Sequence, residues 1–476
     1  MSRILMVTSE ASPFVKTGGL GDVLGSLPPA LARRGEEVAV VVPRYRVADI
    51  PLSDRIWHSM PLNVGPHRFT VAIDQVIRED VRYLFVDCPP LYDRPGIYNE
   101  SGVDYGDNHI RFGLLNQAAL GIARTIFRPD VFHAHDWPAG LLPCYLRTTY
   151  AADPTFSGAK CVLTIHNLGY QGNFPPWTLR DLGLDPAHYH PEGLEFYGNL
   201  SFLKAGIVWA DAVTTVSPTY AREIQTPEFG FGFDGLLRSR AYKLSGILNG
   251  VDYSEWDPRS DPQIPANYSA EDLSGKRICK LALLELLGLP PDSDRPVIGI
   301  VSRFVHQKGF DLFGDIAVDV ADEDVAMAVL GSGEAAIEEM FRYFGRVRPD
   351  KFGVRIGYDN GFAHLVEAGS DMFLMPSRYE PSGLSQMYSL RYGTVPIVRA
   401  TGGLEDSVDG ETGFKFHGYS PLALLAAIRE ALGAYRDRKS WIARMLKGMA
   451  KDFSWDASAA AYQQLYKTGT RVASKP

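Results

Sequence analysis

Short β-rich runs alternate with helical stretches along this chain, and the pattern occurs twice. The first half contains RILMVTS (3–9), EEVAVVVP (36–43), VRYLFVD (81–87), VFHAH (131–135), CVLTIH (161–166) and DAVTTVS (211–217). The second half contains RPVIGIVSR (295–303), VAMAVLGSG (325–333), FGVRIGY (352–358), DMFLMPS (371–377) and TVPIVRA (394–400). Such alternation is typical of parallel sheets covered by helices. The sequence therefore predicts an α/β protein with two doubly wound, Rossmann-like domains and a cleft between them.

The length and one polar connector predict where the domains divide. A chain of 476 residues is too long for one ordinary hydrophobic core. Residues 244–272 are rich in Pro, Gly, Asp and Ser, as expected for a connector. We expect an N-terminal domain over 1–250, a C-terminal domain over 251–455 and an amphipathic helix over 456–476 that packs back across the domains.

Composition excludes several classes of partner. The formal net charge of −8 argues against a nucleic-acid groove or an anionic membrane surface. No run of eighteen apolar residues occurs, and the opening apolar run is too short for a secretion signal, so a cytoplasmic location is expected. The four cysteines form no C-x-x-C pair, which predicts buried thiols rather than a zinc site or disulfides.

A lysine and a glycine cluster follow the first strand. Lys16, Gly18 and Gly19 precede a helix predicted from about Asp22. A dinucleotide-binding loop is the obvious alternative. It is disfavoured because the glycines lie about ten residues beyond the strand, and because the second strand ends in VVVPRY (40–45), without the acidic residue that binds ribose.

Polar residues also follow later strands of the first half, where ligands of parallel sheets bind. The segment HAHD (133–136) would suit a metal, but further ligands at a familiar spacing are missing. We expect His133 to be a hydrogen-bonded core residue. Asp136 and His166 end two strands of one sheet, so a small ligand could contact both.

The second half places cations and small residues at its strand ends. Arg303 and Lys308 follow one strand, Glu380 follows another, and the segments EPSGL (380–384) and TGG (401–403) each open a helix. Helix N-termini and paired cations favour a phosphate or diphosphate. The Asp-x-Asp triplets at 292–294 and 322–324 precede strands, at the wrong edge for ligands. No metal is expected, so Arg303, Lys308 and Lys16 would neutralise the diphosphate.

Seven segments together resemble one family. They are KTGGLGDV, HAHDWPAG, TIHNLGYQG, LNGVD, SRFVHQKGFDL, RYEPSGLSQMYSLRYGTVPIVRATGGLEDSV and DFSW, in order from about residue 3 to 466. In these segments the chain is similar to bacterial glycogen synthases and plastid starch synthases. The resemblance implies the GT-B architecture and a retaining glucosyltransferase without a cofactor. The donor would be ADP-glucose, and the acceptor the non-reducing end of glycogen or a malto-oligosaccharide.

The resemblance also implies roles for individual residues. The catalytic set would be Glu380, Asp136, His166, Arg303 and Lys308. The donor-binding set would be Lys16, Gly18, Gly19, Asp22, Asn249, Arg303, Lys308, Tyr358, Ser382, Gly383, Leu384, Thr401, Gly402 and Gly403. Ser382 stands where the family often has cysteine, which we expect to alter the rate only slightly.

Three other functions remain open. A related glycosyltransferase could use UDP-glucose or make a small glycoside, but KTGGL and HNLGYQG favour a glucan synthase. A non-catalytic sugar-binding protein would normally carry a secretion signal, and it would leave Arg303 and Lys308 without a purpose. A glycogen phosphorylase is disfavoured by length and by the lack of a cofactor-anchoring lysine pattern. Neither double displacement by Glu380 or Asp136 nor same-face attack is selected by the sequence.

Overall fold

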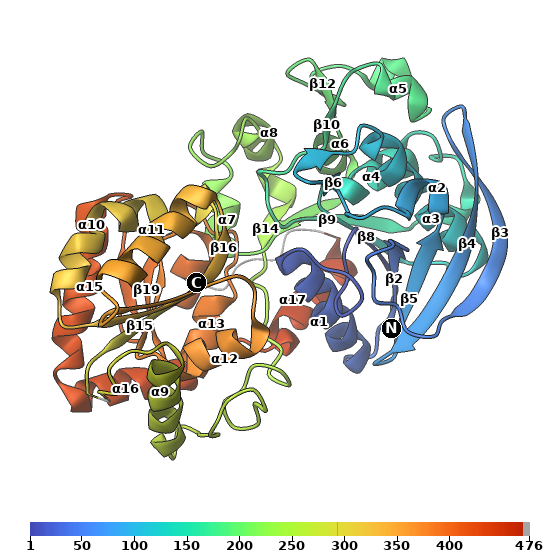
Figure 1. Cartoon of the computed structure of the whole chain (residues 1–476). Helices are drawn as coiled ribbons and strands as arrows, with labels where there is room; N and C mark the ends of the chain where they lie inside the picture. Colours follow the sequence, from blue (N-terminus) through green and yellow to red (C-terminus); the bar gives the residue numbers. More distant parts are fainter. Residues whose placement is uncertain (293, 470–476) are drawn as a thin grey trace. The chain divides into compact units, whose positions relative to one another are not determined.

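The computed structural model describes residues 1–292 and 294–469, and the chain divides into two compact units (Figure 1). Unit 1 comprises residues 1–216, 221–250 and the segment that begins at Trp455. Unit 2 comprises Ser217–Tyr220 and Val251–Ser454. Within the described ranges, no helix is long and apolar enough to cross a membrane.

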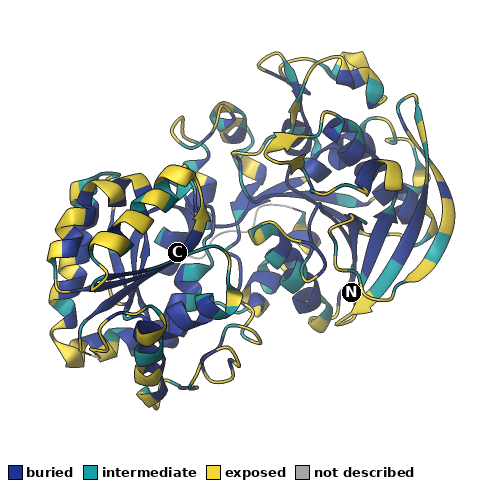
Figure 2. Ribbon diagram, viewed as in Figure 1, coloured by how far each residue is buried: buried dark blue, intermediate teal, exposed yellow. Residues whose placement is uncertain are grey.

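Unit 1 is built on a nine-stranded sheet with the order β14-β13-β9-β8-β1-β2-β5-β4-β3. The strands are β1 (Arg3–Val7), β2 (Glu37–Pro43), β3 (Asp54–Val64), β4 (His67–Arg78), β5 (Val81–Asp87), β8 (Val131–His135), β9 (Lys160–Ile165), β13 (Ala212–Thr215) and β14 (Leu244–Gly246). From β14 to β5 all pairs are parallel. The central strands are almost wholly buried, as Figure 2 shows.

An antiparallel hairpin, which was not predicted, lies at one edge of the unit 1 sheet. Strands β3 and β4 form an antiparallel hairpin, and β4 also pairs antiparallel with β5. A two-residue turn at Gly65, which has a φ of +52°, joins them, and only antiparallel strands can be joined so tightly. One side of this hairpin is exposed, so its sequence lacks the continuous apolar run of a buried parallel strand.

Helices and two small sheets complete unit 1. The helices are α1 (Gly19–Arg33), α2 (Pro89–Tyr92), α3 (Asn108–Thr125), α4 (Leu141–Arg147), α5 (Thr178–Asp181), α6 (Phe202–Trp209), α8 (Asp234–Ser239) and α17 (Trp455–Thr468), with α7 (Pro218–Glu223) crossing the division. The small sheets consist of β6 (Asn99–Glu100) with β7 (Val103–Asp104), and of β10 (Asn173–Phe174), β12 (Asn199–Ser201) and β11 (Glu195–Phe196). Residues 470–476, which the expected C-terminal helix included, lie outside the described residues.

Unit 2 contains a six-stranded, wholly parallel sheet with the order β17-β16-β15-β18-β19-β20. Its strands are β15 (Val297–Phe304), β16 (Ala326–Gly333), β17 (Phe352–Ile356), β18 (Met372–Met375), β19 (Val395–Arg399) and β20 (Phe414–Phe416). Its helices are α9 (Ser274–Leu286), α10 (Phe310–Asp322), α11 (Ala335–Val347), α12 (Asn360–Gly369), α13 (Ser385–Arg391), α14 (Gly402–Ser407), α15 (Pro421–Tyr435) and α16 (Arg438–Met449). The core of unit 2 consists of two hydrophobic clusters, and different helices cover each face of the sheet.

The cysteine prediction is confirmed. Cys88, Cys144, Cys161 and Cys279 are all free and buried.

Candidate active site

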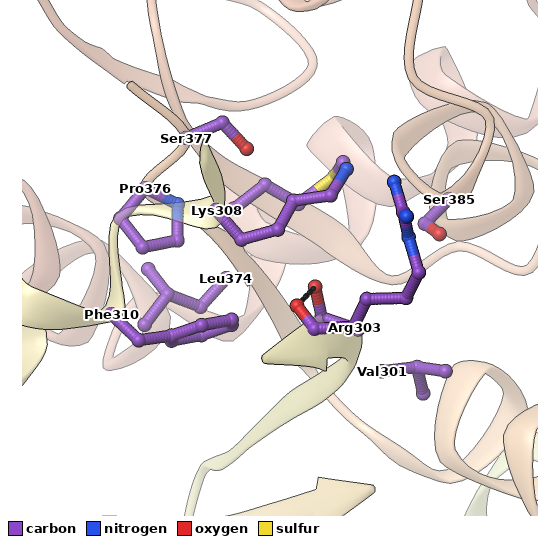
Figure 3. A pocket seen from close by; sticks show the side chains of 10 residues that line it. Val301, Arg303, Lys308, Phe310, Leu374, Pro376, Ser377 and Ser385 are labelled. Atoms are coloured by element: carbon purple, nitrogen blue, oxygen red, sulfur yellow. Dashed lines mark hydrogen bonds between the residues drawn. The ribbon is translucent and has the colours of Figure 1, made fainter. Parts of the chain in front are cut away.

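A cavity of about 170 Å³ lies in unit 2 at the carboxyl end of β15. Arg303 and Lys308 line it, and the apolar side chains of Phe310 and Leu374 form part of its wall. Figure 3 shows the charged ends of Arg303 and Lys308 pointing away from these apolar residues. The exposed Arg303 side chain makes no hydrogen bond or ion pair to any residue that the structure describes. The cavity therefore offers two cations, and the Arg303 guanidinium is not paired with any described residue.

Lys308 is fixed by a buried carboxylate. Its Nζ atom lies 2.6 Å from Oε2 of Glu380, and the two side chains are 17% and 7% exposed. The Ser377 hydroxyl donates a second hydrogen bond of 2.9 Å to the same oxygen. Because Glu380 has two donors on one oxygen, the Lys308 ammonium has a defined position at the rim of the cavity.

Three glycines allow the backbone segments around this cluster to approach closely. A Cβ atom on Gly309, which has a φ of +74°, would lie 2.0 Å from the Pro376 carbonyl oxygen. A Cβ on Gly402 would lie 1.9 Å from the Glu380 carbonyl oxygen, and one on Gly403 equally near that of Ser382. The glycines after β15 and β19 therefore let the backbone pack directly against the segment that carries Glu380.

The remaining predicted residues of unit 2 lie in several environments. The Gly403 N–H donates to the Glu380 carbonyl oxygen at 3.0 Å and is thus engaged within the unit. Ser382 and Thr401 are buried, whereas Tyr358 is 82% exposed. Helix α13 begins at Ser385, after Leu384 and after Gly383, whose φ is +67°.

In unit 1 the predicted loop residues lie at the start of α1. Lys16 Nζ is 2.9 Å from Asp22 Oδ1, and both side chains are partly exposed. A Cβ atom at Gly18 or Gly19 would meet nothing within 4 Å. No contact with the described residues thus requires glycine at these two positions.

A residue that the sequence analysis missed, Glu10, anchors this loop. Its buried carboxylate accepts hydrogen bonds from the Thr17 N–H, from the Thr17 hydroxyl at 2.8 Å and from the Tyr98 hydroxyl at 2.6 Å. The available signal was a glutamate three residues beyond the buried strand β1. A charged residue is rarely buried unless it has partners. Glu10 therefore determines where the backbone beside Lys16 lies.

Replacing Thr17 by valine tests this anchor. The change keeps the side-chain shape but removes a hydrogen bond to a carboxylate, which is worth about 1.5–3 kcal/mol. With ADP-glucose, the donor that the resemblance implies, we expect kcat/KM to fall about tenfold or more in steady-state assays. Thr17→Ser keeps both donors to Glu10 and should behave as the wild type. Equal losses in the two variants would exclude an anchoring role for the hydroxyl.

Asp136 lies directly after β8 in a strained conformation. Its φ is 55° and its ψ is −172°, which is close to a region that only glycine adopts readily. Its Oδ1 accepts the His166 N–H at 2.7 Å and the Asn167 N–H at 3.4 Å. Burial raises the pKa of the Asp136 carboxyl to about 7, although these two N–H donors act in the opposite direction. Strain of this kind is concentrated at functional sites.

Asp136 and His166 are thus brought together, as expected for residues that follow the carboxyl ends of two neighbouring strands. His166 is buried, and this burial lowers its pKa to about 3, so the ring is neutral at pH 7. Asn249 is also buried, and its Oδ1 atom has no hydrogen-bond partner within the described residues.

Two other residues after or within strands are structural. His133 is confirmed as a core histidine, because its ring nitrogens contact the hydroxyls of Tyr466 and Thr164 at 2.8 and 2.7 Å. Arg44, at the end of β2, pairs with Asp74 of β4. In residues 1–292 and 294–469, no group of three or more His, Cys, Asp or Glu residues is arranged to hold a metal ion.

Known protein families account for most of the chain. A family described as "Starch synthase catalytic domain" matches residues 3–239, and one described as "Glycosyl transferases group 1" matches residues 288–447. A curated "Glycogen synthase" of Anaeromyxobacter sp. (strain Fw109-5) is 51% identical over 484 residues, which covers 98% of this chain and 99% of the relative. The chain belongs to the glycogen synthase family. The "Glycogen synthase" of Koribacter versatilis is 47% identical over 478 residues and 99% of both chains.

Solved structures agree with this membership of the glycogen synthase family. The structure "Catalytic domain of Starch Synthase IV from Arabidopsis thaliana bound to ADP and acarbose" has a TM-score of 0.90 and 31% identity, and the match covers 98% of this chain and 99% of that one. Sucrose-phosphate synthase from Thermosynechococcus elongatus has a TM-score of 0.63 at 17% identity, with the same coverage, and shows the fold alone. The predicted family and the predicted GT-B fold are therefore confirmed, and the chain is a glycosyltransferase.

Proposed function

We propose that this member of the glycogen synthase family transfers glucose from ADP-glucose to the non-reducing end of an α-1,4-glucan, with retention of configuration and release of ADP. The single observation that carries the proposal is the cation pair at the unit 2 cavity, where Arg303 is uncommitted and Lys308 is held by Glu380. Family membership supports the choice of the glucan, and the ADP bound to the similar starch synthase supports the nucleotide.

In unit 2 the proposed task is to bind the leaving diphosphate. Negative charge grows on the diphosphate as the bond to glucose breaks, and preorganised cations stabilise that charge. We assign this role to Arg303 and Lys308. Glu380 holds Lys308 in place and lies beside the sugar, and the segment from Ser382 to Leu384, with Thr401, Gly402, Gly403 and Tyr358, completes the donor side.

In unit 1 the proposed task is to bind and activate the transferred glucose. Breaking the donor bond with retention passes through a transition state with positive charge on the sugar ring, and a carboxylate such as Asp136 stabilises that charge. His166, whose backbone Asp136 holds, would contact a sugar hydroxyl. Lys16, with Gly18, Gly19 and Asp22, would contact the donor, and so would Asn249, whose unsatisfied Oδ1 atom supports a ligand contact.

Nucleotide release tests the proposal directly. The purified protein is given ADP-glucose or UDP-glucose, each with and without glycogen and in the presence of EDTA. We expect glycogen-dependent release of ADP that EDTA does not reduce, with much slower release of UDP. Faster release from UDP-glucose would overturn the assignment of the donor. Release that is independent of glycogen would overturn the assignment of the acceptor.

A further inference from the structure

Three buried histidines of unit 1, His133, His135 and His166, form a chain of ring contacts. His133 and His135 share one face of β8, and their ring centroids are 4.0 Å apart. The next contact is a hydrogen bond of 3.0 Å between Nδ1 of His135 and Nε2 of His166, which follows β9. All three side chains are buried. The proposed function uses only His166, so the purpose of His135 is still to be explained.

Only one of the two nitrogens in the hydrogen bond between His135 and His166 carries a hydrogen atom. Burial holds the pKa of each ring well below its usual range, so both rings are neutral at pH 7. A neutral imidazole carries hydrogen on one nitrogen and a lone pair on the other. Either Nδ1 of His135 donates to His166, or Nε2 of His166 donates to His135.

The other nitrogen of His135 decides between these arrangements. Its Nε2 atom is fully buried and has no hydrogen-bond partner among the residues that the structure describes. If His166 were the donor, this Nε2 atom would carry a buried N–H group without an acceptor, and such groups are rare in proteins. If His135 is the donor, Nε2 holds only a lone pair. The hydrogen therefore belongs on Nδ1 of His135.

The hydrogen on His135 fixes the state of His166. With its Nε2 atom accepting, the neutral His166 ring must carry its own hydrogen on Nδ1. That Nδ1 atom makes no hydrogen bond within the described part of unit 1, and it is not one of the fully buried unpaired atoms. It is thus available to a ligand as a hydrogen-bond donor.

We propose that His135 is a positioning residue, which donates its Nδ1 hydrogen to His166 and so makes His166 present an N–H group to a hydroxyl oxygen of the transferred glucose. The inference rests on the proposed function for the identity of the sugar, but the direction of the hydrogen bond does not. His133 makes no hydrogen bond to either of these histidines within the described part of the chain, because its two ring nitrogens contact the hydroxyls of Tyr466 and Thr164.

The proton position can be measured without any assay of activity. In the whole protein labelled with ¹⁵N-histidine, the resonances of His166 are assigned by their loss in His166→Gln, and two-bond couplings show which nitrogen carries hydrogen. We expect hydrogen on Nδ1 of His166 and a lone pair on Nε2. Hydrogen on Nε2 of His166 would overturn the proposal.

Variants of His135 test the functional consequence. The side-chain amide of asparagine can place a donor where Nδ1 of His135 lies, whereas leucine cannot. For His135→Leu we expect kcat to fall about tenfold, since one hydrogen bond that orients a catalytic group is lost, with little change in KM for ADP-glucose. His135→Asn should recover most of this loss, and His133→Gln, which alters the same cluster without removing a bond to His166, should retain turnover.

The outcomes separate this proposal from the proposed function. Equal losses in His135→Asn and His135→Leu, or an equal loss in His133→Gln, would count against the positioning role. If His135→Leu does not fold, His135→Asn and the wild-type spectrum still decide the question. If the wild type transfers glucose from no donor, the proposed function fails, and the spectrum still decides the direction of the His135–His166 hydrogen bond.

Discussion

Lys308→Ala is expected to lower kcat by about 10²–10³-fold or more, because one preorganised charge partner of the departing diphosphate is lost. The effect should exceed that of a surface cation, since the Lys308 ammonium is held 2.6 Å from Glu380 and both side chains are largely buried. Single-turnover assays with ADP-glucose and glycogen would measure the chemical step separately from ADP release. We expect losses of the same order for Arg303→Ala and Glu380→Ala.

A second buried lysine in unit 2 provides the matched control. Lys280 Nζ lies 2.6 Å from Asp371 Oδ2, with side chains 6% and 14% exposed, but Lys280 does not line the cavity. Lys280→Ala should destabilise the fold by removing the ion-pair partner of the largely buried Asp371 carboxylate, and it should leave kcat of the folded protein near the wild-type value. If Lys308→Ala and Lys280→Ala reduce kcat equally, the role of Lys308 is structural. Lys308→Gln, which keeps a donor for Glu380, separates loss of charge from loss of that contact.

Asp136→Asn is expected to be the second severe change, with kcat about 10²–10³-fold lower and the fold retained. Asparagine preserves the shape of the side chain, and its carbonyl oxygen can still accept the His166 and Asn167 N–H groups. The variant therefore removes the negative charge but keeps the anchor. Asp80, an exposed acid of unit 1 with a φ of 59°, supplies the control Asp80→Asn, which should not affect turnover. Near-normal turnover of Asp136→Asn would show that Asp136 only positions the backbone of His166 and Asn167.

The same carboxyl predicts a pH dependence. Because burial raises the pKa of Asp136 to about 7, the group is largely protonated below that pH and ionised above it. If its charge stabilises the transition state, kcat of the wild type rises as pH increases through about 7, and the Asn variant lacks this rise. Stability has the opposite sign. Between about pH 4 and pH 7 the folded state keeps a proton on Asp136 that the unfolded state has released. The free energy of unfolding therefore falls as pH rises through this range.

Much of the fold could be predicted from the sequence because its central strands are buried. The runs 81–87 and 131–135 coincide with β5 and β8 to the residue, since a short apolar run bounded by polar residues is a strong signal. The hairpin of β3 and β4 was not predicted. Its exposed side carries polar side chains, and its pairing is antiparallel, so it lacks the pattern of the strands beside it.

The site could be predicted only in part, for a related reason. The rule that ligands bind beyond the carboxyl ends of parallel strands was enough to select Asp136, His166 and Arg303. The contacts of Glu10 with Thr17 and of His135 with His166 depend on how a loop folds back and on the register that places His135 opposite Thr164. Neither of these can be read from the spacing of residues along one strand.

The return of α17 to unit 1 has a consequence for the order in which the chain folds during synthesis. The His133 ring of β8 is hydrogen-bonded to Tyr466 of α17, 333 residues further along the chain. A ribosome that has made all of β8 has therefore not yet made the helix that covers this histidine. The main segment of unit 2, from Val251 to Ser454, is continuous and precedes α17, so all strands of unit 2 are synthesised before this helix. Although the N-terminal half emerges first, α17 can cover it only after unit 2 has been made.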